Sequence, residues 1–454
     1  MHAGCSNLPT LHPDMELRDP RPVQLEGAKG PLAPERSKAI LASLKAQGPA
    51  ESAIFERHLA VESATVSSPL VVGNRVTLLQ DGKATYDAMF AAIAGAKDHI
   101  NFETYIIDDD DTGKRFASAL IDKQRRGVQV NFIYDSVGSM ETPREFFQPM
   151  KDAGIRVLEF NPVNPLTAKK GWDVNSRDHR KLLIVDGQVA FLGGVNISSV
   201  YSGGSIKRSA YAKKKDKEID SGERELPWRD THLRVEGPVV AQFQKLYLDT
   251  WEKQKGEPLA QLRYFPPLKP TGRDVVRAIG SAGDDEYSLM YVTLISAIRS
   301  AESTVYLINA YFVPDPQFLA TLKDAAKRGV DVRLILPSKT DNNLVLHAGR
   351  ARYAELLEAG VKIYERRDRL LHTKAAVIDG VWSTVGSTNL DWRSFLHNDE
   401  VNAAILGAEF GAQMRAMFDA DLAQSDEITL EQWQRRSIGS RLMESASRIW
   451  ERML

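Results

Sequence analysis

Hydrophobic and polar residues alternate along the chain in blocks that predict helices and strands in turn, and the same order of blocks occurs twice. Residues 92–105 match residues 297–311, and each stretch predicts a helix end followed by a strand. Residues 126–133 match residues 328–335, where Arg-Gly-Val leads from a helix through a glycine stop into a strand. This repeat predicts an α/β protein of two duplicated lobes, each a mostly parallel mixed sheet flanked by helices. A pseudo-two-fold axis would relate the lobes, with one site shared between them.

Proline clusters predict where the lobes begin and end. Six prolines between positions 9 and 34 oppose regular structure and predict a Pro-rich tail over residues 1–36. A second cluster predicts a linker over residues 257–280. The first lobe is therefore expected over residues 37–256 and the second over residues 281–430.

Composition narrows the functional classes. Across 454 residues, 59 Lys+Arg and 60 Asp+Glu give a formal net charge of -1, so overall charge predicts neither a nucleic-acid binder nor an acidic scaffold. The single cysteine, Cys5, excludes an internal disulfide framework and a multi-cysteine metal site.

No apolar run approaches the roughly 18 residues that span a bilayer. Ala3-Gly4-Cys5 is similar to the end of a lipoprotein signal, which predicts a lipid anchor at Cys5 if the true start lies upstream; otherwise the match is accidental.

Each half of the repeat ends in the pattern H-x-K-x-x-x-x-D, with Gly seven and Asn ten residues after the Asp. The copies are His179, Lys181, Asp186, Gly193 and Asn196 in the first half and His372, Lys374, Asp379, Gly386 and Asn389 in the second. About 0.15 accidental matches to H-x-K-x-x-x-x-D are expected from the composition. Two copies at equivalent points of a repeat are therefore not accidental.

The pattern suits chemistry on a phosphodiester. His and Lys two residues apart on a strand point to the same face, so lobes that meet at their axis bring two of each into one pocket. One histidine attacks phosphorus, the other protonates the leaving alkoxide, and the lysines stabilise the phosphoryl charge. Neither a metal nor a cofactor is expected, because the lysines supply the positive charge. The candidate substrate-binding residues beside them are Asn196, Asn389, Gly194 and Ser387.

Catalytic histidines need a partner that fixes their tautomer, and that partner is usually a carboxylate. Asp230 and Glu400 occupy corresponding positions in the last strand of each lobe, 170 residues apart. We predict that Asp230 orients His179 and that Glu400 orients His372. Asp186 and Asp379 are also candidates for the catalytic set, although their position at a strand end favours a structural turn over an acid–base role.

These paired motifs resemble the HKD signatures of the phospholipase D superfamily over roughly residues 70 to 430. Residues 386–400, with N-x-D-x-R-S and N-x-E elements, and residues 310–315 are similar to bacterial cardiolipin synthases, specifically to the short form without N-terminal membrane helices. The resemblance implies a phosphatidyltransferase that joins two phosphatidylglycerols through a phosphohistidine and releases glycerol. It further implies that His179 is the nucleophile and His372 the acid, although the pseudo-symmetry alone permits the reverse.

Other functions stay open at this point. A phospholipase D hydrolase, a phosphodiesterase or nuclease of the same superfamily, and an inactive membrane scaffold all fit parts of the pattern. The lipid enzyme is favoured. Its expected partners are anionic phospholipid and the membrane surface, with no nucleic acid and no obligate protein partner. We expect it to be a peripheral protein of the bacterial cell membrane. Residues 431–454 predict a basic amphipathic helix that lies at that membrane or else packs on the core. The lysine-rich residues 203–227 are either a solvated loop or a contact for the lipid headgroup.

Overall fold

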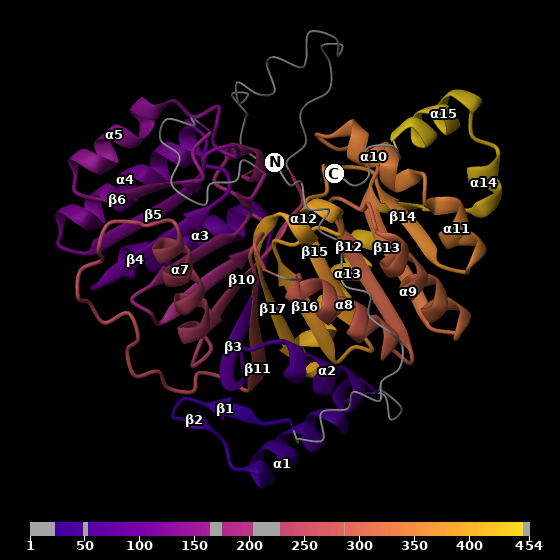
Figure 1. The fold of residues 1–454 in the computed structure, drawn as a ribbon, viewed down its shortest axis with the longest axis horizontal. Helices are drawn as coiled ribbons and strands as arrows, with labels where there is room; N and C mark the ends of the chain where they lie inside the picture. Colours follow the sequence, from indigo (N-terminus) through magenta and orange to yellow (C-terminus); the bar gives the residue numbers. More distant parts are fainter. Residues whose placement is uncertain (1–22, 49–52, 164–174, 203–227, 286, 448–454) are drawn as a thin grey trace.

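The computed structural model describes residues 23–48, 53–163, 175–202, 228–285 and 287–447, which form two α/β lobes side by side (Figure 1). The strands of both lobes follow the same spatial order. Across the first lobe this order is β6 (Arg156–Phe160), β5 (Gln129–Asp135), β4 (His99–Thr104), β8 (Lys181–Val185), β9 (Val189–Gly193), β10 (Thr231–Glu236) and β3 (Leu70–Gln80). Across the second it is β14 (Lys362–Arg366), β13 (Asp331–Pro337), β12 (Thr304–Asn309), β15 (Lys374–Ile378), β16 (Trp382–Gly386), β17 (Asn398–Leu406) and β11 (Asp274–Ser281).

The two sheets join where β3 pairs antiparallel with β11, with Asn74 opposite Asp274 and Val71 opposite Val276. Among the seven strands given for each lobe, the outer three run parallel to one another and the others are antiparallel to their neighbours. The expectation of a mixed sheet is confirmed, but the mostly parallel part is limited to that outer half. The inner half is antiparallel because β8 returns into β9, and β15 into β16, through turns too short for a parallel crossover. A last strand, β18 (Ser425–Ile428), pairs antiparallel with the outer edge of β14.

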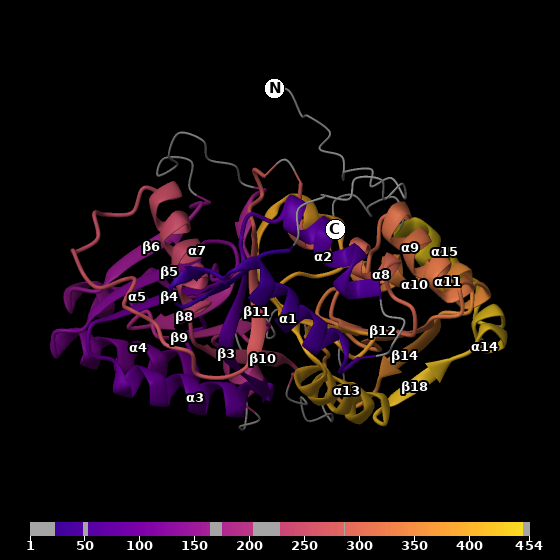
Figure 2. The same cartoon turned by 90° about the horizontal axis from the view of Figure 1, so that it is seen from below.

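Helices cover both faces of this sheet, and equivalent helices lie on opposite faces (Figure 2). In the first lobe, α3 (Asp81–Gly95) and α4 (Asp111–Arg125) lie on one face and α7 (Val240–Lys253) on the other. In the second lobe, α8 (Leu289–Arg299) and α9 (Pro316–Lys327) lie on the face of α7, and α13 (Ala408–Leu422) lies on the face of α3. This exchange of faces is consistent with the predicted pseudo-two-fold relation between the lobes. The shorter α5 (Arg144–Asp152) follows β5.

The predicted helix, glycine and strand sequence is confirmed in both lobes. Asp110 and Asp315 cap the starts of α4 and α9 by accepting backbone N–H groups, and Pro316 opens α9. Each helix then ends just before a glycine with positive φ, 90° at Gly127 and 92° at Gly329. A residue with a Cβ would be strained there, so glycine ends the helix and leads into the next strand.

The predicted N-terminal boundaries differ from the structure. Within the expected tail, β1 (Leu25–Gly27) pairs with β2 (Gly30–Pro31) and with β3, and α1 (Pro34–Lys45) begins at a proline. The following η1 (Ala53–Phe55) and α2 (Arg57–Thr65) belong to the buried cluster of the second lobe, through Ile54, Phe55 and Leu59. Apolar burial of these residues outweighs the local effect of the prolines. The lipid-anchor hypothesis for Cys5 and the alternatives for residues 203–227 lie outside the described residues.

Two further boundaries differ as well. The linker predicted over residues 257–280 reaches only to residue 273, because β11 begins at Asp274 and joins the sheet. The predicted C-terminal helix is two short helices, α14 (Leu430–Gln434) and α15 (Ile438–Ser447), with residues 448–454 outside the description. They lie near α10 (Asn343–Arg350) and α11 (Tyr353–Glu358), where Trp433 packs on Tyr353 with ring centroids 4.8 Å apart (Figure 1). None of the described helices is long and apolar enough to cross a membrane.

Candidate active site

Both histidines stand at the start of the strand that each motif predicts. Lys181 and Lys374 are the first residues of β8 and β15, and each histidine comes two residues earlier. Lys181 pairs with Thr104 at the end of β4, and Lys374 with Asn309 at the end of β12. The motifs therefore lie at the same edge of the joined sheet, at the carboxyl ends of its parallel strands.

The chain segments before the two histidines cross to the opposite lobe. Short strand β7 (Arg177–Asp178) pairs in parallel with the first residues of β17, and the His179 N–H donates to the Asp399 carbonyl over 2.9 Å. In the symmetric arrangement Leu371 forms a bridge with Arg229, and the His372 N–H donates to the Arg229 carbonyl over 2.8 Å. Each histidine is thus joined by its backbone to the residue just before the other lobe's carboxylate.

As a result, the carboxylate that contacts each histidine comes from the other lobe. His179 Nδ1 lies 3.0 and 3.1 Å from the two Glu400 oxygens, and His372 Nδ1 lies 2.7 Å from Asp230 Oδ2. The predicted pairing, Asp230 with His179 and Glu400 with His372, is therefore wrong, although the structure does bring these carboxylates to the two histidines. Equivalence in a repeat identifies corresponding positions, and the crossing backbone decides which copies touch.

Burial sets the protonation of the four basic groups. Each lysine Nζ donates to the carbonyl of the histidine in its own motif. Burial lowers the pKa of Lys181 to about 7, and the nearby Lys374 ammonium acts in the same direction. Burial lowers the pKa of Lys374 to about 8, against the opposing effect of Asp230 and Glu400. Burial and the two lysines hold the pKa of His179 well below its ordinary value. Burial also lowers the pKa of His372, while nearby Asp230 acts in the opposite direction. Such a pocket favours a bound phosphate, whose negative charge restores the protonated lysines.

The two carboxylates have different neighbours. Glu400 accepts hydrogen bonds from Ser387 Oγ and from Asn398 Nδ2, the latter over 3.3 Å. Burial raises the pKa of Glu400 to about 7, against the opposing effects of Lys181 and these donors. On the other side, Gly194 lies so close to Asp230 that a Cβ there would be 2.1 Å from Oδ1. Any larger residue at this position would displace the carboxylate from His372.

The asparagines proposed for substrate binding are both buried beside the motifs. Asn196 uses its side chain within the protein, accepting from the Ile106 N–H over 3.2 Å and donating to the Tyr201 hydroxyl over 3.0 Å. Asn389 Oδ1 is buried with no hydrogen-bond partner among the described residues. Asn389 therefore has more capacity than Asn196 to meet a ligand.

Asp186 and Asp379 shape the turns that follow the motif strands. The Asp186 carboxylate accepts the backbone N–H groups of residues 97, 98 and 99, and the Asp379 carboxylate those of residues 302, 303 and 304. Their φ angles are positive, 54° and 51°, as expected for Asp in a tight turn. These contacts favour the structural alternative over an acid–base role.

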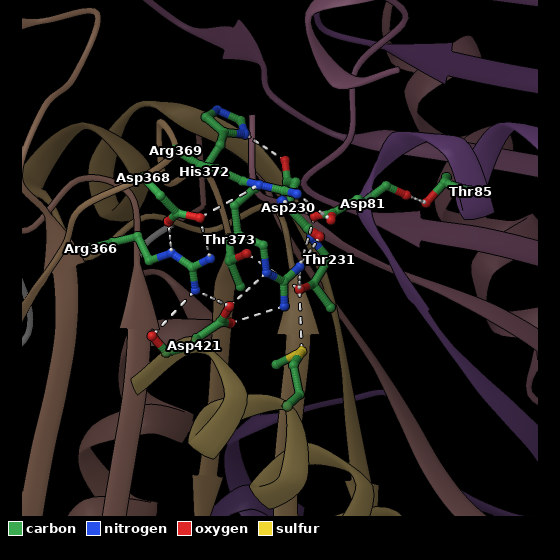
Figure 3. A network of polar contacts seen from close by, with 12 residues as sticks. Asp81, Thr85, Asp230, Thr231, Arg366, Asp368, Arg369, His372, Thr373 and Asp421 are labelled. Carbon is green, nitrogen blue, oxygen red and sulfur yellow. Dashed lines mark hydrogen bonds and ion pairs between the residues drawn. The ribbon is translucent and has the colours of Figure 1, made fainter. Parts of the chain in front are cut away.

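A network of charged side chains from both lobes lies behind the second histidine (Figure 3). Asp421 of α13 accepts from Arg229 Nε and Nη2 over 2.8 and 2.9 Å. Arg229 also reaches Asp81 over 3.2 Å, and Asp81 Oδ1 accepts the Asp230 N–H over 3.2 Å. The network therefore fixes the backbone of the carboxylate that contacts His372.

Aromatic side chains complete the surroundings of both histidines. The Tyr105 ring lies 4.9 Å from His179, and the rings of Tyr201 and Trp228 lie 5.9 and 5.2 Å from His372. Tyr201 and Trp228 were not predicted as site residues. Neither has a residue of the same type at the matching point of the repeat, so repetition gave no signal for them.

Two duplicated lobes that place paired His–Lys motifs at one shared edge define a phospholipase D-like protein. A family described as "Cardiolipin synthase, PLD-like domain" matches residues 89–202 and 294–422, one stretch in each lobe. The chain is 34% identical over 390 residues to a cardiolipin synthase of Geobacillus sp. (strain WCH70), covering 85% of this chain and 74% of that one. It is 32% identical over 443 residues to a cardiolipin synthase of Geobacillus thermodenitrificans (strain NG80-2), covering 97% and 80%. The chain therefore belongs to the cardiolipin synthase family, as its motifs predict.

The fold is also similar to a solved structure. The phosphatidylserine synthase of Haemophilus influenzae Rd KW20 superposes with a TM-score of 0.64 at 12% identity, covering 88% of this chain and all of that one. At this identity the likeness concerns the fold alone. It supports the description of two α/β lobes built on a mixed sheet.

Proposed function

We propose that the protein makes cardiolipin by moving a phosphatidyl group from one phosphatidylglycerol to another phospholipid, a second phosphatidylglycerol in the simplest case, and releasing glycerol. One observation carries the proposal: two buried histidines, each oriented by a carboxylate from the other lobe, share an edge of the sheet with two lysines. Membership of the cardiolipin synthase family supports a phospholipid as the phosphodiester.

In the first step, the neutral imidazole of His179 attacks phosphorus through Nε2, since Nδ1 is engaged by Glu400. The N–P bond forms and the P–O bond to the glycerol headgroup breaks. His372 gives its proton to the departing oxygen, so that glycerol leaves as a neutral alcohol. Lys181 and Lys374 offset the charge on the phosphoryl oxygens.

In the second step, a hydroxyl of the acceptor lipid attacks the phosphohistidine. His372 takes the proton of that hydroxyl, the new P–O bond forms and the N–P bond breaks. His179 returns to its neutral form and His372 to its protonated form. The pair is then ready for another donor.

Differences between the histidines support this division of roles. A nucleophile must be unprotonated, and burial with the lysines keeps the pKa of His179 well below its ordinary value. An acid must hold a proton, and Asp230, 2.7 Å from His372, favours the charged imidazole against the effect of burial. The assignment agrees with the roles that the family resemblance implies.

A peripheral position on a bacterial membrane fits the exposed apolar residues at the C-terminal end of the described chain. Leu442 and Met443 on α15 are 66% and 54% exposed, and Leu344 on the neighbouring α10 is 38% exposed. Arg435 and Arg441 lie close by in the sequence and would contact anionic headgroups. A lipid anchor at Cys5, on the condition that the true start lies upstream, would add a second attachment.

The proposal is tested by incubating the protein with phosphatidylglycerol vesicles in the presence of a chelator. We expect cardiolipin and glycerol to appear together, to disappear with His179→Ala, and to persist with His347→Ala as the matched control. Phosphatidic acid as the sole lipid product would instead identify a phospholipase D hydrolase. Cleavage of single-stranded DNA without turnover of any phospholipid would identify a nuclease.

A further inference from the structure

The two halves of the site differ at three positions that the repeat makes equivalent. Around Glu400 these positions hold Ser387, Ser394 and Asn398, which are small and polar. The equivalent residues around Asp230 are Gly194, Tyr201 and Trp228. Two polar side chains near the first histidine therefore correspond to two aromatic rings near the second.

These aromatic rings form one continuous wall against His372. Tyr201 and Trp228 meet edge to face with centroids 5.3 Å apart, and both contact the His372 ring. Tyr201 is 2% exposed, and its hydroxyl is held by Asn196 over 3.0 Å. Trp228 is half-buried, so it extends the wall from the interior towards solvent.

We propose that the wall of Tyr201 and Trp228 is the subsite for the alcohol portion of the substrate, and that it favours the carbon-bearing face of a glycerol group over water. The proposal rests on the function given above. His372 exchanges its proton with the alcohol oxygen in both steps, so the leaving glycerol and the incoming lipid hydroxyl must each lie beside this histidine. Tyr201 meets this ring on the Nδ1 side, with its hydroxyl 3.3 Å from that atom. The half-buried Trp228 is therefore the member of the wall placed to line the alcohol, with Tyr201 packed against it.

The chemistry of the wall fits that ligand. Aromatic rings pack well against C–H groups, and a wall without charge gives an attacking water few partners to orient it. Water at the same place would take the phosphatidyl group from His179 and give phosphatidic acid. The wall therefore controls how the phosphohistidine is divided between cardiolipin and phosphatidic acid.

The experiment measures the ratio of phosphatidic acid to cardiolipin from phosphatidylglycerol vesicles. Trp228→Asn places the side chain of Asn398 at the equivalent point of the other half, and we expect the ratio to rise about threefold to tenfold. Trp228→Phe keeps an aromatic ring and should leave the ratio near that of the unchanged protein. Tyr105→Leu removes the ring beside His179, and both products should slow together at an unchanged ratio. Thermal melts of each variant identify any loss of folding.

The outcomes separate this inference from the proposed function. A higher ratio with Trp228→Asn alone supports the alcohol subsite. Equal slowing of both products in Trp228→Asn, or the same ratio change in Tyr105→Leu, would overturn it while the synthase function stands. Absence of both products with the unchanged protein would overturn the synthase function and the subsite together.

Discussion

Glu400 and Asp230 each contact the Nδ1 atom of a histidine, and the two histidines are related by the repeat, yet the two carboxylates lie in different surroundings. Glu400 accepts from a serine hydroxyl and an asparagine amide, and burial raises its pKa to about 7. Asp230 faces a glycine and two aromatic residues, and its backbone is fixed by the network of Asp81 and Arg229. The duplicated backbone places the groups, and the neighbouring side chains then separate their roles. Substitutions on each side of the site can therefore be compared with one another.

The largest effect is expected from replacing the histidines themselves, and a lipid with an activated leaving group distinguishes them. With phosphatidylglycerol, His372→Asn should lower the rate by about 10²–10⁴-fold, the usual contribution of a general acid. With phosphatidyl-p-nitrophenol, whose leaving group departs without a proton, His372→Asn should recover most of its rate. His179→Asn should stay inactive with both lipids.

Release of p-nitrophenol in a single-turnover assay gives both rates directly. Recovery by His179→Asn and inactivity of His372→Asn would reverse the roles of the two histidines. The surroundings of the two histidines would still differ, but the aromatic wall of Tyr201 and Trp228 would then lie beside the nucleophile.

The next largest effect is expected from the cross-lobe carboxylates. Asp230→Asn should reduce kcat by up to about 10⁴-fold, the loss found when an amide replaces the carboxylate of a Ser-His-Asp triad. Glu400→Gln should cost less, because Ser387 still anchors the side chain and because Glu400 itself is partly protonated near neutral pH. Steady-state rates with phosphatidylglycerol measure both losses.

The Glu400 effect should also depend on pH. The pKa of Glu400 is raised to about 7, so below this pH the carboxyl is neutral and Gln resembles it. Above this pH the carboxylate accepts the ring N–H of His179 with a full negative charge, whereas the Gln amide can accept it only as a neutral group. The ratio of wild-type to Glu400→Gln activity should therefore grow as pH rises through about 7. A ratio that stays flat across this range would contradict the assignment.

A smaller effect is expected from the lysines. Their pKa values, about 7 for Lys181 and about 8 for Lys374, mean that the free enzyme loses positive charge as pH rises through this range. Because kcat/KM reports the free enzyme, it should fall on the alkaline side. Lys181→Arg keeps its charge at any accessible pH and should move the alkaline limb towards the value of Lys374. If Lys181→Arg leaves the alkaline decrease in kcat/KM at the same pH, another group must cause that decrease.

The repeat made most of the site predictable. Equal offsets after the two histidines located both lysines, both turn-forming aspartates and both carboxylates without any structural information. The pairing of carboxylates with histidines could not be predicted in the same way, because it depends on backbone hydrogen bonds between β7 and the start of β17 and on their counterpart at Arg229. Those bonds join segments far apart in the sequence and leave no pattern in it.

The aromatic wall was missed for the opposite reason. A repeat reveals what its two halves share, and Tyr201 and Trp228 are positions where the halves differ. The N-terminal residues were misread because proline content was weighed without the apolar residues between the prolines, such as Leu25, which is fully buried. Local composition predicts what a segment cannot form by itself, but not what a neighbouring lobe can stabilise.

Because each histidine contacts a carboxylate from the other lobe, the order of synthesis decides when the site can form. His179 is separated from Glu400 by 221 residues and His372 from Asp230 by 142. His179 of the first lobe therefore gains its carboxylate only after β17 of the second lobe has been synthesised. A chain that ends before β17 would lack the carboxylate that contacts His179, so the complete site forms only when synthesis of the fold is nearly finished.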